Sequence, residues 1–343
     1  MGRANEMTES QCGVPRRREW MLFGLGPDAY SWRGVGLLCG VYFGAMVFAA
    51  VLSPAVFHAA GWWVDTFPGW WNRWLEGRTD FGDFPRHFDR LRWVPVVLLF
   101  PFLLNACGLL SWRALGLRFG REDGELFWRG MIGGCALVGV LMLFQLAFVT
   151  VTIDARYAYG GEYDAMLWIL PGALILSLVE EIVFRGFIFR IFYSALRPVT
   201  AIVVSAVVFA YLHYKMPPDV WREIGDAVGW LSGFQVAWGT LTGIAHDFSA
   251  VPFFTLVLVG ILLNLVFLRT GSLLACIGVH AGIVWLRMAY DKTHNTPLAE
   301  HAWFFGTAAL NDGLLTLLLL GLAVWYLLWE VRQYERYRRN QSQ

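Results

Sequence analysis

Eight stretches of mostly apolar residues constrain the fold of this chain more than any other feature. They cover residues 34–56, 92–111, 130–152, 166–190, 198–214, 251–268, 272–290 and 313–330. Each is close to the ~20 residues that a helix needs to cross a bilayer. Of the 343 residues, 57% are hydrophobic and only 15% are charged, whereas about 25% are charged in a typical globular protein. The sequence therefore predicts an all-α, polytopic membrane protein with about eight transmembrane helices.

Basic residues at both ends of the chain predict its orientation. Arg16, Arg17 and Arg18 precede the first apolar stretch, and the last is followed by Arg332, Arg336, Arg338 and Arg339. Positive residues favour the cytoplasmic side of a membrane. We expect a cytoplasmic tail over residues 1–33, one transmembrane domain over 34–330 and a basic cytoplasmic tail over 331–343. The expected location is the plasma (inner) membrane, and two termini on one side require an even number of spans.

Two long connections complicate this scheme. Residues 57–91 are rich in Trp, Gly, Asp and Arg, and we expect a structured loop at the membrane interface. Residues 227–245 either cross the membrane as a ninth span or lie in its interface. The even number of spans favours the interfacial interpretation.

Several classes of function are excluded or disfavoured by composition. The formal net charge of +1 and the lack of a basic stripe give no reason to expect a nucleic-acid partner. Five cysteines without a CxxC pair indicate neither a disulfide framework nor a thiolate zinc site. The expected surroundings are the lipid bilayer and a peptide or membrane-protein substrate.

Ionisable side chains inside the apolar stretches are the strongest indication of function. They are Glu180, Glu181 and Arg185 in the fourth stretch, His213 at the end of the fifth and His280 within the seventh. Such groups cost about 2.5–3.5 kcal/mol each at the centre of a membrane helix and by default mark a functional site.

Helical spacing separates the two glutamates. Glu181 and Arg185 are four residues apart and share a helix face, so they can form an ion pair. Glu180 points about 100° away, and its partner must come from another helix, with His213 and His280 as the candidates. A carboxylate so placed can act as a general base on water, and histidines can stabilise an oxyanion. The set suits hydrolysis of an amide or ester, without the GxSxG or HExxH motifs of other hydrolases.

These residues resemble the motifs of the CPBP family, the CAAX proteases and bacteriocin-processing enzymes also called Abi. EEIVFRG at 180–186 is similar to its EExxxR motif, FAYLH at 209–213 to its FxxxH motif, and LRTGSLLACIGVHA at 268–281 to the approach to its third motif. The resemblance covers roughly residues 166–290. It implies an intramembrane endopeptidase in which Glu180 activates water, His213 binds that water and His280 supports the oxyanion. Glu181 and Arg185 would form a structural ion pair supporting the site.

One departure from the family pattern leaves alternatives open. Position 284 is Val, where the third motif commonly has Asn, and Asn264 is a candidate substitute donor. The alternative function is therefore a catalytically inactive CPBP-like protein that binds peptides, as in immunity or scaffolding. A proton-coupled transporter is disfavoured because no repeats are visible. No cofactor is expected. If the protein depends on a metal, zinc would be held by Glu180, His213 and His280.

Overall fold

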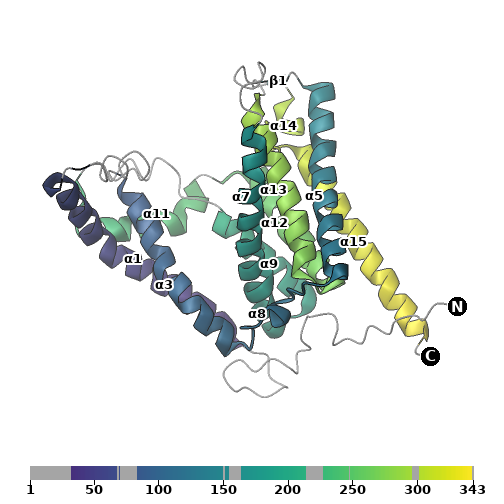
Figure 1. Ribbon diagram of the computed structural model, residues 1–343, viewed down its shortest axis with the longest axis horizontal. Coiled ribbons are helices and arrows are strands. Elements are labelled where there is room, and N and C mark those ends of the chain that lie inside the picture. The colour runs from purple at the N-terminus through teal and green to yellow at the C-terminus, as the bar shows by residue number, and fades with distance from the viewer. Residues whose placement is uncertain are drawn as a thin grey trace. The chain divides into compact units, whose positions relative to one another are not determined.

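The all-α class is confirmed by the structure, a computed structural model that describes residues 32–67, 69, 83–149, 151–153, 164–213, 227–246, 248–295 and 301–341. The eight predicted stretches correspond to α1 (Trp32–Thr66), α3 (Phe84–Ala106), α5 (Arg121–Phe148), α7 (Asp164–Glu181), α9 (Pro198–His213), α12 (Ala250–Thr270), α13 (Leu273–Thr293) and α15 (Leu314–Gln341) (Figure 1). Shorter elements are α4 (Trp112–Leu115), η3 (Ile182–Ile188), α8 (Phe189–Ala195), α11 (Ser232–His246) and α14 (Ala302–Phe305). A two-residue strand β1 (Thr152–Ile153) pairs antiparallel with β2 (His294–Asn295).

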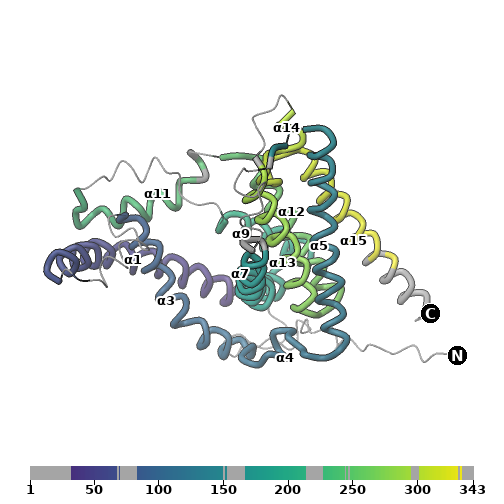
Figure 2. Tube along the Cα trace, turned by 45° about the horizontal axis from the view of Figure 1, so that its top comes forward, coloured from purple at the N-terminus to yellow at the C-terminus, as the bar shows by residue number. Residues whose placement is uncertain are grey.

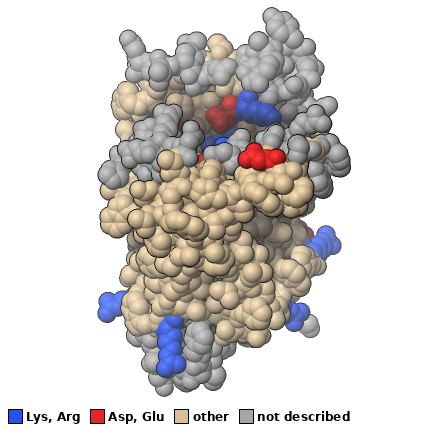
Figure 3. Space-filling model, turned by 90° about the vertical axis from the view of Figure 1, so that its left-hand side faces the viewer, with Lys and Arg blue, Asp and Glu red and all other residues tan. Residues whose placement is uncertain are grey.

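The helices have the length and apolarity of membrane spans. Among the described residues, five continuous helical segments are long and apolar enough to cross a bilayer: 32–66, 121–148, 167–195, 250–270 and 273–293. Two shorter apolar helices, 198–213 and 314–330, accompany them. On the face drawn in Figure 3, uncharged residues make up most of the described surface. The chain is a polytopic membrane protein, and the number of eight crossings stays a prediction.

The loop that we expected over residues 57–91 is shorter in the structure. Helix α1 continues to Thr66, and α3 already begins at Phe84. Residues 68 and 70–82 lie outside the described part of the chain. Trp62 and Trp63, which fall within the expected loop, lie instead in the last turns of α1, where both are exposed.

The described helices separate into two compact units. One comprises Cys107–Tyr211 and Ser249–Gln343, and we call it the core unit. Within it, α13 packs against α5, α7 and α12, while α15 packs on α12. The views in Figures 1 and 2 agree that α5, α12 and α13 run side by side. The apolar centre lies between α12 and α13 and includes Leu263, Phe267, Cys276 and, from earlier helices, Phe189 and Phe209.

Glycines bring α5 and α13 into backbone contact. A Cβ atom on Gly134 would collide with the carbonyl oxygen of Val279, and one on Gly278 with that of Phe127. Gly130 and Gly282 meet the opposite backbone in the same way. Small residues spaced four apart allow membrane helices to approach this closely. The contact fixes α13 against α5 on both sides of His280.

The second unit consists of Trp32–Ala106 and Leu212–Phe248. Here α11 packs against α1 and α3, and Gly233 abuts the backbone of Ala50. His58 Nε2 lies 3.0 Å from the carbonyl oxygen of Val228. At 15 residues, α11 is about 22 Å long, shorter than the ~30 Å hydrocarbon core, which agrees with an interfacial helix. The expectation of one domain over 34–330 stays a prediction.

Candidate active site

The helix that carries the two glutamates changes its geometry immediately after them. α7 ends at Glu181 and continues as a π-helix, η3, which contains Arg185 and gives way to α8 at Phe189. π-helical segments are rare and frequently occur at functional sites. Because a π-turn needs an extra residue, the side chains after the break are rotated relative to a continuous α-helix. This rotation was not foreseen from the even 3.6-residue spacing used for the sequence.

Glu181 is bound from two sides. Arg185 Nη1 donates to Glu181 Oε1 at 2.8 Å, the pairing that the four-residue spacing predicted. His280 Nδ1 lies 2.8 Å from the same oxygen. All three side chains are buried, with 0% of the side chain of Glu181, 1% of Arg185 and 6% of His280 exposed. Since an ionised carboxylate only accepts hydrogen bonds, Nδ1 of His280 is the protonated donor.

Arg185 ties this cluster to two further helices. Its Nη2 donates to the carbonyl oxygen of Gly260 on α12 at 3.3 Å. Its guanidinium lies 4.7 Å from the ring centroid of Phe209 on α9, a cation–π distance. Gly260 has no room for a side chain because Ala206 of α9 lies against it. The arginine is therefore held by α7, α9 and α12 together.

Glu180 is the more accessible of the two carboxylates. Its Oε2 lies 3.8 Å from Nε2 of His280, and 18% of its side chain is exposed. The imidazole of His280 therefore stands between the two glutamates, with Nδ1 on Glu181 and Nε2 facing Glu180. A water-activating base needs such access, so the structure distinguishes the two adjacent acids by exposure.

His213 is the last residue of α9, one helical turn after Phe209. In the core unit, the ring of Phe209 lies 6.2 Å from that of His280. The structure thus brings Glu180, Glu181, Arg185 and His280 together in the core unit. His213 falls in the second unit, and its part in the site stays a prediction.

Asn264 does not fit the role of a substitute oxyanion donor. Its side chain is buried, and Nδ2 donates to the carbonyl oxygen of Ile202 at 3.1 Å and to Ser205 Oγ at 2.8 Å. An amide nitrogen has two hydrogens, and both are used in joining α12 to α9. Val284 follows His280 by four residues on α13 and supplies no side-chain donor.

No group of three His, Cys, Asp or Glu side chains in the described part of the chain is arranged as a set of metal ligands. Both ring nitrogens of His280 instead face carboxylates.

The bond between Glu181 and His280 was not predicted from the sequence, because helical spacing compares residues only within one helix. The GxxxG spacing of Gly130 with Gly134 and of Gly278 with Gly282 was a visible signal that α5 and α13 pack closely.

One comparison with known proteins found a match. Residues 162–286 match the family model described as Rce1-like, type II CAAX prenyl endopeptidase Rce1-like. No curated protein and no solved structure matches the chain. The matched segment contains Glu180, Glu181, Arg185, His213 and His280. The resemblance to the CAAX proteases is thereby confirmed for residues 162–286, a segment that is similar to the Rce1-like family.

Proposed function

We propose that the protein is a CAAX-type intramembrane endopeptidase, which hydrolyses a peptide bond at or near the membrane surface with a glutamate-activated water. One observation carries the proposal: Glu180, Glu181 and His280 meet within an apolar helix bundle, inside the segment that matches a prenyl endopeptidase family. Buried charge in a membrane bundle is costly and by default functional.

Each residue has a role in the proposed reaction. Glu180 removes a proton from a water molecule that His213 helps to bind, and the water oxygen adds to the carbonyl carbon of the peptide bond. His280, held by Glu181 through Nδ1, directs Nε2 toward the reacting groups and, when protonated there, donates to the oxyanion. Glu180 then passes its proton to the leaving amine as the C–N bond breaks, giving a carboxylate and an amine.

An inactive peptide-binding or scaffold protein is the second candidate. Val284 favours it, because this position has no donor where the family commonly has Asn, and Asn264 is fully engaged elsewhere. Loss of one oxyanion donor costs about 2.7–4 kcal/mol of transition-state stabilisation in other hydrolases. Such a loss lowers the rate by two to three orders of magnitude and still leaves a measurable reaction.

Glu180→Gln distinguishes the two candidates. The amide preserves shape but cannot take a proton, so cleavage should fall at least about 100-fold while the folded protein remains in the membrane. Peptides or proteins that accumulate on the Glu180→Gln variant, compared with wild type by mass spectrometry, would identify the substrate. Glu122→Gln, an acid in the first turn of α5, is the matched control and should cleave normally.

Two results would contradict the proposed reaction. Cleavage that persists in Glu180→Gln removes this residue from the role of base. A cellular phenotype that survives Glu180→Ala, with no substrate accumulating, supports the inactive binding protein instead. We further propose that the substrate is a short C-terminal or leader peptide, and that the enzyme resides in the plasma (inner) membrane with both termini in the cytoplasm.

A further inference from the structure

A recess lies in the core unit, lined by none of the residues of the glutamate cluster. It is formed by the segment that leads from α4 into α5 and has a volume of about 430 Å³, within the range of small-ligand sites. Its lining includes Trp112, Arg113, Leu117, Arg118, Phe119 and Asp123. None of these residues takes part in the proposed reaction.

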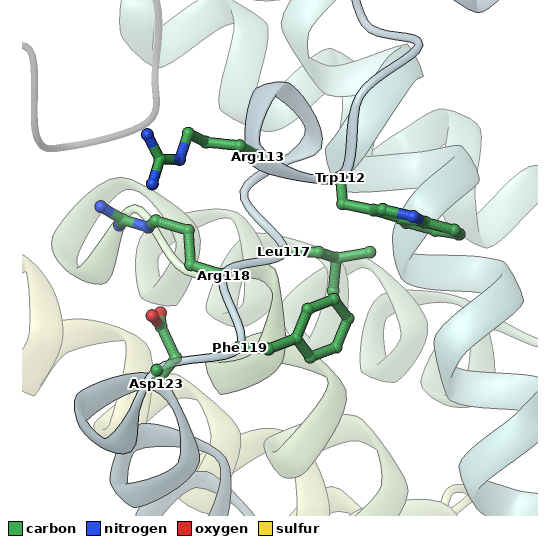
Figure 4. Close-up of a pocket in the computed structure, with 7 residues that line it drawn as sticks. Trp112, Arg113, Leu117, Arg118, Phe119 and Asp123 are labelled. Carbon is green, nitrogen blue, oxygen red and sulfur yellow. The ribbon is translucent and has the colours of Figure 1, made fainter.

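The recess has a charged side and an apolar side. Figure 4 shows the guanidinium groups of Arg113 and Arg118 together on one side, with the carboxylate of Asp123 below them. The rings of Trp112 and Phe119 lie on the other side. These two rings are 62% and 78% exposed. Exposed aromatic residues beside arginines are typical of the membrane–water interface, where lipid headgroups meet acyl chains.

Buried contacts hold this segment in place. Arg190 of α8, itself 2% exposed, donates through Nη1 to the carbonyl oxygen of Ala114 at 2.6 Å. The amide of Leu273 donates to the carbonyl oxygen of Gly116 at 2.9 Å, and Gly116 adopts the left-handed conformation with φ of 88°. Arg118 Nη2 also reaches the carbonyl oxygen of Gly271 at 3.4 Å. The recess is therefore preformed and attached to the start of α13.

Its charges select the chemistry of a ligand. Two guanidinium groups on one side suit a phosphate, whose oxygens match the planar N–H fork of arginine. Asp123, at 8% exposure, is a largely buried carboxylate at the lower edge of the recess and can accept a hydrogen bond from a cationic N–H group of a ligand. A phosphate joined to a primary ammonium by a two-carbon arm satisfies both requirements. A choline headgroup has no N–H to donate, and a glycerol headgroup has no positive charge.

We propose that this recess binds the headgroup of an ethanolamine phospholipid. The phosphate lies on Arg113 and Arg118, the ammonium on Asp123, and the glycerol and upper acyl chains lie against Trp112 and Phe119. The site is independent of the proposed protease activity, because it uses different residues and its occupation is measured without a substrate.

Native mass spectrometry of the full chain in a neutral detergent tests this assignment. Phosphatidylethanolamine should be retained at least about tenfold better than phosphatidylglycerol or phosphatidylcholine, as expected for one charge-assisted hydrogen bond. Asp123→Asn should abolish the preference for ethanolamine while leaving weak retention of phosphatidylglycerol. Arg113→Gln should weaken retention of all three lipids.

Arg121 provides a matched control. It is the first residue of α5 and its side chain is 92% exposed outside the recess, so Arg121→Glu should leave retention unchanged, whereas Arg113→Glu should abolish it. Arg113 and Arg121 are both exposed, so these two variants test lipid binding to the recess even if Asp123→Asn fails to fold. Equal retention of the three lipids, or a preference for phosphatidylglycerol, would overturn the proposal. So would displacement by soluble phosphorylethanolamine at equal concentration, which would indicate a free metabolite as ligand.

Discussion

Glu181 accepts hydrogen bonds from both Arg185 and His280, and these two bonds are the main chemical feature of the cluster. The pair with Arg185 satisfies two buried charges, while the bond to His280 fixes which ring nitrogen carries the proton. In the proposed reaction, Glu181 is therefore a positioning residue, and its neighbour Glu180 has the more exposed carboxylate of the two. The two functions can be separated by substitution.

Arg185→Met should destabilise the protein by about 3–5 kcal/mol, because it leaves Glu181 charged and buried without its cationic partner. The double substitution Glu181→Leu/Arg185→Met removes both charges and should recover most of that stability. Cleavage should stay low in the double variant, because His280 has lost its Nδ1 acceptor. Thermal unfolding in detergent and a cleavage assay measure the two effects, and recovery of both together would show that the pair is only structural.

The ring nitrogens of His280 also bear on metal dependence. Both face carboxylates, at 2.8 Å for Nδ1 and 3.8 Å for Nε2, an arrangement suited to hydrogen bonding and proton transfer. We therefore expect a strong chelator to leave cleavage unchanged, and metal analysis of the purified protein to find less than one zinc per chain. Loss of cleavage on chelation with recovery on added zinc would instead assign Glu180, His213 and His280 as ligands.

The placement of α13 depends on its contact with α5. Gly134→Val should destabilise the protein by at least about 1–3 kcal/mol, because its side chain would overlap the backbone of Val279. The adjacent Gly133 has no atom within 4 Å of an added Cβ, so Gly133→Val is a matched control with little expected effect. Thermal unfolding measures both variants. Equal losses would show that helix propensity, rather than the α5–α13 contact, determines the result.

Most of the helices could be predicted from the sequence, because apolar length alone identifies a membrane span. α9 and α12 match their predicted stretches to within two residues at each end. The π-helix over Ile182–Ile188 could not be predicted, because its residues, apart from Arg185, are apolar like those of the α-helices on either side. The bond from Glu181 to His280 joins residues 99 positions apart, and no periodicity within one helix encodes such a contact.

If both termini lie in the cytoplasm, as their positive residues predict, the number of membrane crossings is even. Whether the number is even depends on whether α11 crosses the membrane or lies in its interface. If its 15 residues lie in the interface, the positions on its two sides face the same compartment. If they cross the membrane, those positions face opposite compartments and the C-terminal tail moves to the other side.

Single cysteines in a cysteine-free variant test this topology with a membrane-impermeant maleimide. Gly229→Cys and Ser249→Cys flank α11 and should both be labelled from outside intact cells, as should Ala158→Cys in the acidic loop over 153–165. Gln343→Cys should react only after the cells are opened, because arginines hold the tail inside. Opposite labelling of positions 229 and 249 would make α11 a span, and a tail that reacts in intact cells would confirm the odd number of crossings that follows.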